Sequence, residues 1–102
     1  MNKARFDLNE LQKKQVESWS EFLNVPSMSL GIYQLAANTN DKATHTPHER
    51  DEVYVCLSGA GMLFVDGDPM QVRRDTVIYV KAGVEHYFDE ISENLTLLVF
   101  FA

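Results

Sequence analysis

Short runs of apolar residues, separated by glycine- and aspartate-rich turns, occupy the chain from residue 27 to its end. In residues 27–35 the apolar side chains follow the two-residue period of a β-strand. Similar short runs cover residues 53–57, 62–65, 70–72, 76–80, 86–88 and 95–101. About seven short strands punctuated in this way predict an all-β fold, an antiparallel sandwich or barrel.

The first 26 residues have a different pattern. Segment 9–22 is polar, and its apolar residues Leu11, Val16, Trp19 and Phe22 have loosely helical spacing. Pro26 ends any helix there. We therefore expect residues 1–26 to form an N-terminal arm or short helix that packs on the β-barrel domain of residues 27–102 or reaches across to a second subunit.

Two of the predicted strands are apolar on both faces. Residues 53–57 and 97–101 carry apolar side chains at consecutive positions, so each strand needs a cover on both sides. A second sheet can cover one face and a partner subunit the other. This pattern is consistent with a partner subunit.

Composition and charge narrow the class of protein. A chain of 102 residues holds one domain, and its apolar content of 45% is typical of a globular protein. With 9 basic and 15 acidic residues the net charge is −6, which argues against binding to nucleic acid or to an anionic membrane. No apolar run approaches the roughly 20 residues that span a bilayer. The polar N-terminus shows no secretory signal, so we expect a soluble, cytoplasmic protein.

The candidate chemistry lies in the histidines His45, His48 and His86. If residues 48–52 are extended, His48 and Glu52 face the same side, and His86 can complete a set of two imidazoles and one carboxylate. Such a set binds divalent first-row metals and leaves coordination positions open. His45 or Thr46 could add a fourth contact from the preceding loop. From spacing alone, surface histidines or histidines with satisfied hydrogen bonds are the more ordinary explanation.

Two motifs strengthen the metal hypothesis. Residues 47–61 resemble the first motif of the cupin superfamily, in which histidines precede a glutamate that is followed by six residues and a glycine; here these are Glu52 and Gly59. Residues 80–86, which end in His86, resemble the second motif. The similarity covers residues 28–101 and is greatest to small single-domain bacterial cupins of the conserved-barrel type.

This resemblance implies a jelly-roll barrel, a double-stranded β-helix, with the motif residues in its mouth. It implies a divalent iron, manganese, nickel or zinc ion held by His48, Glu52 and His86, with His45 as a further candidate ligand. It also implies a small-molecule substrate or ligand and a homodimer. The chain departs from the motifs at Thr46, where the first histidine is usual, and at Lys81, where proline is usual.

Two functions from different classes fit these features. One is a dioxygenase- or isomerase-like metalloenzyme, in which Tyr54, on the same face as Glu52, donates a hydrogen bond beside the metal. The other is a non-catalytic module that binds a sugar or metabolite, which the missing first histidine favours. Cys56 shares the parity of Tyr54, but without a basic partner it is expected to pack in the interior.

Overall fold

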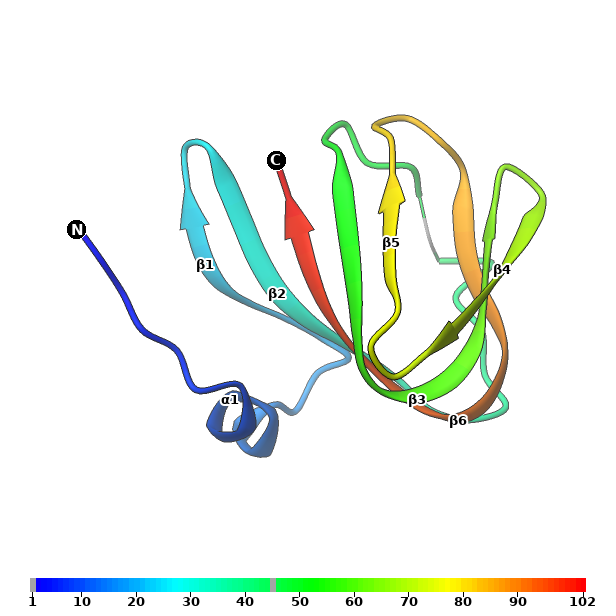
Figure 1. Cartoon of the computed structure of the whole chain (residues 1–102), viewed down its shortest axis with the longest axis horizontal. Helices are drawn as coiled ribbons and strands as arrows, with labels where there is room; N and C mark the ends of the chain where they lie inside the picture. Colours follow the sequence, from blue (N-terminus) through cyan, green and yellow to red (C-terminus); the bar gives the residue numbers. More distant parts are fainter. Residues whose placement is uncertain (1, 45) are drawn as a thin grey trace.

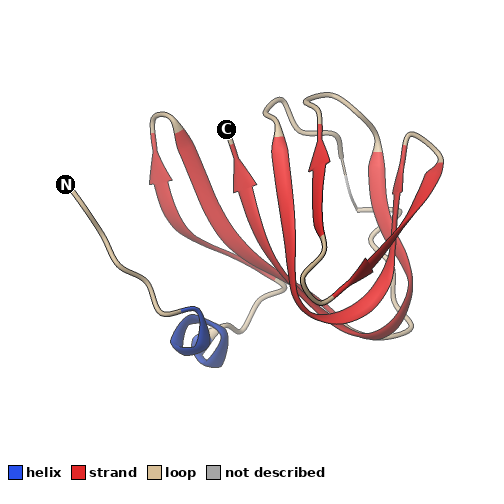
Figure 2. Ribbon diagram, in the orientation of Figure 1, coloured by secondary structure: helices blue, strands red, loops and turns tan. Residues whose placement is uncertain are grey.

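The computed structural model describes residues 2–44 and 46–102, and these form one short helix and six strands (Figure 1). Antiparallel pairing joins the strands into one sheet that curls over on itself, and Figure 2 shows how little helix accompanies it. The all-β prediction is therefore confirmed. The elements are α1 (Leu8–Lys14), β1 (Trp19–Val25), β2 (Met28–Leu35), β3 (Glu52–Val65), β4 (Asp68–Arg73), β5 (Val77–Val80) and β6 (His86–Phe101).

The two longest strands, β3 and β6, pair along their whole length as one antiparallel ribbon. Glu52 lies opposite Phe101 at one end, and Val65 lies opposite His86 at the other. The first end of the ribbon is flanked by β5 on one side and by β2 and then β1 on the other. The second end is flanked by β4. Figure 1 shows the ribbon, green and orange to red, curving through the base of the molecule so that its ends form opposite walls.

The ribbon bends where the register of the two strands shifts. The shifts fall between Cys56 and Met62, around Gly59. Gly59 has a φ of 94°, and a Cβ there would overlap the carbonyl oxygen of Asn94 in β6. The sequence pattern predicted two separate strands, residues 53–57 and 62–65, with a glycine-rich turn at residues 58–61 between them. That prediction is wrong, because these glycines form a β-bulge within one continuous strand. Bulges and turns both favour glycine, so the sequence alone does not distinguish them.

The core fills the space between the two walls. Tyr54 and Cys56 of β3 point into it, as their shared parity with Glu52 predicted, and are 3% and 1% exposed. The other side chains of the buried cluster are Leu63, Val72, Ile78, Val80, Phe88, Ile91, Leu95, Leu97 and Val99. Since the cluster draws on β3, β4, β5 and β6, it holds the bent ribbon closed.

The N-terminal segment contributes a strand as well as a helix. Asp7 caps α1 by accepting the backbone N–H of Glu10 at 3.0 Å, and none of the helix's residues is fully buried. Residues 19–25 then form β1, which pairs with β2. The sequence pattern did not reveal this strand, because an edge strand with polar Ser20, Glu21 and Asn24 lacks clear alternation. Among the described residues, no helix is long and apolar enough to cross a membrane.

The bend predicts a large difference between two glycine substitutions. Gly67→Ala adds a Cβ at positive φ, where nothing lies within 4 Å, and should cost about 1 kcal/mol of unfolding free energy. Gly59→Ala adds a collision with the backbone of Asn94 and should cost at least about 2 kcal/mol more. Urea denaturation of both variants measures the difference. Equal losses would show that the close approach at Gly59 does not hold the bend.

Candidate metal centre

Three potential ligands meet inside the mouth of the barrel. Glu52 begins β3, His86 begins β6 on the opposite wall, and His48 lies in the loop before β3. Glu52 Oε1 lies 3.2 Å from His86 Nε2 and 3.7 Å from His48 Nε2. One ligand atom from each residue falls within a group no more than 4.8 Å across. Glu52 and His86 are buried, whereas His48 is partly exposed.

Backbone hydrogen bonds tie the two motif loops to each other. The N–H of Gly83 donates to the carbonyl of His48 at 2.8 Å, and the N–H of Ala82 donates to Asp51 Oδ1 at 2.8 Å. Gly83 has a φ of 82°, which suits glycine in the turn before β6. These contacts fix the segment carrying His48 against the turn that carries His86.

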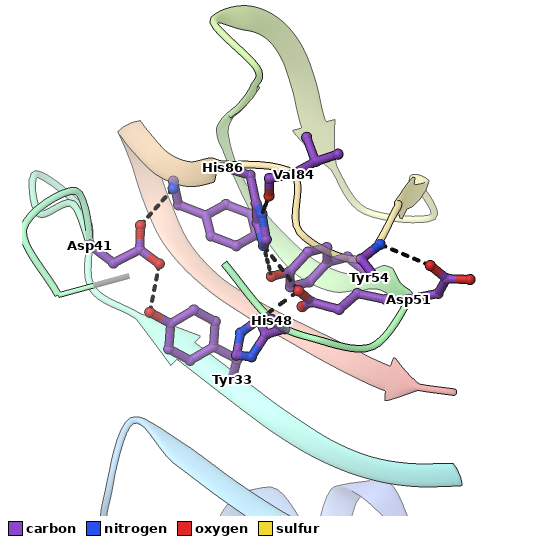
Figure 3. Close-up of polar contacts among 10 residues, drawn as sticks. Tyr33, Asp41, His48, Asp51, Tyr54, Val84 and His86 are labelled. Carbon is purple, nitrogen blue, oxygen red and sulfur yellow. Dashed lines mark hydrogen bonds and ion pairs between the residues drawn. The ribbon is translucent and has the colours of Figure 1, made fainter. Parts of the chain in front are cut away.

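Hydrogen bonds also orient the ring of His86. Its Nδ1 lies 2.8 Å from the carbonyl of Val84, which can only accept, so Nδ1 carries a proton. Nε2 therefore points toward Glu52, and the Tyr54 hydroxyl lies 3.0 Å from it (Figure 3). A metal-binding imidazole is characteristically held this way, with the far nitrogen on a carbonyl and the near nitrogen available.

The charges at this point call for a cation. Burial lowers the pKa of His86, but its contacts with Glu52 and Val84 outweigh burial and raise the pKa above the ordinary value. Burial and the nearby Glu52 carboxylate raise the pKa of Tyr54, so its phenol remains a hydrogen-bond donor. Glu52 Oε2 is buried without a hydrogen-bond partner. Glu52 Oε1 and an unprotonated His86 Nε2 are both hydrogen-bond acceptors, and they lie only 3.2 Å apart. Their repulsion is removed by a proton on Nε2 or by a metal ion between them, so the group fits a divalent cation.

A cavity of about 600 Å³ is lined by two of the three candidate ligands, His48 and Glu52, and by Tyr54. Its aromatic wall contains Trp19, Tyr33 and Phe101, and Thr46, Arg50 and Glu52 supply polar groups. The indole of Trp19 lies over Gly31 of β2, where a Cβ would overlap it. Because Gly31 has no side chain, Trp19 of the edge strand β1 can lie against the inner face of the sheet.

Asp41 anchors the long loop between β2 and β3. Its Oδ1 accepts the backbone N–H of Phe88 at 2.6 Å, and its Oδ2 accepts the Tyr33 hydroxyl at 2.7 Å. Figure 3 shows this carboxylate bridging to the Tyr33 ring. Nothing in the local sequence indicated this role for Asp41, because an aspartate in a polar loop carries no local sign that it will be only 3% exposed.

The structure brings His48, Glu52 and His86 together, with Tyr54 next to them. Thr46, which replaces the first histidine of the motif, lines the cavity. His45, the further candidate ligand, lies outside the described residues.

Comparison with known proteins agrees with the fold. Residues 31–101 match the family model described as "Cupin domain". The chain is 41% identical over 100 residues to "Uncharacterized protein SCO3923" of Streptomyces coelicolor, covering 95% of this chain and 93% of that protein.

Solved structures share the fold at low sequence identity. TT1209 from Thermus thermophilus is 23% identical with a TM-score of 0.76, and the match covers 96% of this chain and 95% of that one. The Cnp3 cupin domain of Schizosaccharomyces pombe is 18% identical with a TM-score of 0.71. That match covers 82% of this chain but 62% of the Cnp3 structure, less than two thirds of its length.

The contact between Gly31 and Trp19 generates a spectroscopic prediction. Gly31→Ala should push the indole off the sheet and toward water, which shifts the emission of the single tryptophan to longer wavelength. Gly67→Ala serves as the control, because its Cβ meets nothing within 4 Å. Unchanged emission in the folded Gly31→Ala protein would contradict the position of Trp19.

Proposed function

This chain belongs to the cupin family, and from that premise we propose that it is a metal-binding cupin that acts on a small organic molecule in its cavity. His48, Glu52 and His86 hold a divalent iron, manganese, nickel or zinc ion. The observation that carries the proposal is the set of three ligand atoms within 4.8 Å, two of them from buried side chains, at the edge of a cavity.

The ligand set favours a dioxygenase- or isomerase-like metalloenzyme. Two imidazoles and one carboxylate occupy only part of the coordination sphere of a first-row ion. Such an ion polarises a substrate oxygen or activates water or O₂. The Tyr54 phenol, held 3.0 Å from His86 Nε2, is the candidate hydrogen-bond donor to a substrate at the inner end of the cavity.

A second candidate is a cupin that binds a sugar or metabolite without catalysis. Thr46 favours it, because a hydroxyl replaces an imidazole in the first motif and lowers the expected metal affinity. Metal content separates the two candidates. A protein without a first-row metal after reconstitution would support the binding module.

We also propose that two copies of the chain associate through the outer face of the sheet. Val53 and Val55 of β3 lie beside Tyr79 and Val77 of β5 and beside Phe100 and Leu98 of β6. This stripe carries no charge, and Val77 and Tyr79 are 63% and 57% exposed. An uncharged apolar stripe can face a second copy of itself across a two-fold axis.

The cytoplasmic location expected from the sequence remains a prediction.

Metal content tests the proposed ligands. Glu52→Gln keeps the size of the side chain but removes the carboxylate, and should reduce bound zinc or iron from about one ion per chain to less than a tenth of that. Glu49→Gln is the matched control, since Glu49 also lines the cavity but is not one of the three ligands. Tyr54→Phe should keep the metal, because the phenol supplies no ligand atom.

Elemental analysis after reconstitution and desalting gives the result. The triple change of His48, Glu52 and His86 to alanine should abolish bound metal. Metal content that is the same in the triple variant and in the unaltered protein would remove the proposed centre.

The oligomeric state tests the apolar stripe. The unaltered protein should elute in size-exclusion chromatography with light scattering at twice the 11.6 kDa mass of the chain. Val77→Asp should give the single-chain mass, because a carboxylate cannot be buried unpaired at an interface. Val16→Asp, at an apolar residue that is 93% exposed and lies outside the stripe, should leave the dimer intact. A single-chain mass for the unaltered protein would refute the dimer.

A further inference from the structure

Arg50 gives the cavity a positive charge that no carboxylate of the described residues neutralises. It is the only lysine or arginine among the described residues that line the cavity. Its guanidinium donates to Ser29 Oγ at 3.4 Å and to the carbonyl of Phe101 at 3.3 Å, and both distances are longer than the roughly 2.7–3.2 Å usual for such hydrogen bonds. It forms no ion pair with a described carboxylate. Most of its five N–H donors are thus left for a ligand.

The groups that hold Arg50 are themselves fixed. Ser29 is 3% exposed, and it lies opposite Phe101 in the β2–β6 ladder. A guanidinium anchored to a buried hydroxyl and a strand carbonyl loses little freedom when it binds an acid. Its planar fork matches a carboxylate with two parallel hydrogen bonds.

An aromatic wall runs from this cation to the candidate metal centre. The Phe101 ring contacts the His48 ring at 4.9 Å and the Trp19 ring at 5.9 Å, measured between centroids. Trp19 in turn contacts Tyr33 at 6.4 Å. Phe101 therefore joins Arg50, through its carbonyl, to His48, through its ring. A flat apolar body can pack along this wall between the two polar ends.

The charges that line the cavity favour an anion beside Arg50. The Arg50 guanidinium has no described carboxylate as an ion-pair partner, and a divalent ion would offset the negative charge of Glu52. The other acids that line the cavity, Glu21 and Glu49, are exposed to solvent, which screens them. The cavity of about 600 Å³ lies within the range of small-molecule sites.

We propose that the cavity takes a small, flat organic acid whose carboxylate pairs with Arg50 and whose ring lies along Trp19 and Phe101. The proposal rests on the proposed function only in placing this ligand beside a metal. Arg50 is thereby a determinant of specificity for anionic ligands.

Quenching of the single tryptophan, Trp19, measures binding of benzoate as the probe, with uncharged benzamide as its isostere. Benzoate should bind the zinc-loaded protein at least tenfold more tightly than benzamide. Arg50→Gln should weaken benzoate binding about tenfold or more and leave benzamide unchanged, as expected for loss of a charge-assisted hydrogen bond. Arg74→Gln, an exposed arginine outside the cavity lining, should behave like the unaltered protein.

Two further measurements keep the outcomes distinct. Arg50→Lys retains the charge without the planar guanidinium and should bind benzoate with intermediate affinity. This variant still tests the role of the charge if Arg50→Gln fails to fold. Zinc content is measured for every variant, and the titration is repeated on chelator-treated protein. If the unaltered protein holds no zinc, the proposed metal centre is refuted. The proposed acid site at Arg50 would still be supported if metal-free protein prefers benzoate over benzamide and Arg50→Gln removes that preference. Equal benzoate affinity with and without Arg50, or no preference for benzoate over benzamide, would overturn it.

Discussion

The bend of the β3–β6 ribbon is the constraint on which the candidate centre depends. Glu52 and His86 lie at opposite ends of this ribbon, which would be roughly 40 Å long if straight. In the folded chain their polar atoms are 3.2 Å apart. Gly59, at positive φ against the backbone of Asn94, permits the curvature that brings the ends together. The same curvature creates the interior that the core side chains fill.

Burial of a carboxylate against an imidazole is unfavourable unless a proton or a metal ion lies between them. Glu52 keeps one oxygen without a hydrogen bond, and His86 has its Nδ1 proton committed to the carbonyl of Val84. A structure that only needed stability would fill this space with apolar side chains, as the rest of the core does. The unsatisfied oxygen is therefore better explained by a ligand than by packing.

The cavity combines an apolar wall with polar groups at separate places. Trp19 reaches it from an edge strand because Gly31 leaves space, and Phe101 contacts both His48 and Arg50. Asp41 holds the loop between β2 and β3 in place through two short hydrogen bonds, one from Phe88 of β6 and one from Tyr33 of β2. The N-terminal strand and the part of the long loop around Asp41 thus contribute to the site, although neither carries one of the three candidate ligands.

Local sequence was enough to predict the all-β fold, the three candidate ligands and the inward position of Tyr54. These features depend on residue alternation and on two short motifs. Both kinds of pattern can be recognised within one short segment, without knowing what that segment contacts. Local sequence missed β1 and misplaced a turn at residues 58–61, because edge strands and bulges share their residues with loops and turns. The roles of Asp41 and Arg50 arise from contacts with Phe88 and Phe101, which lie about half the chain away. Only the folded chain brings such partners together, so only the tertiary structure defines the cavity and the arginine that lines it.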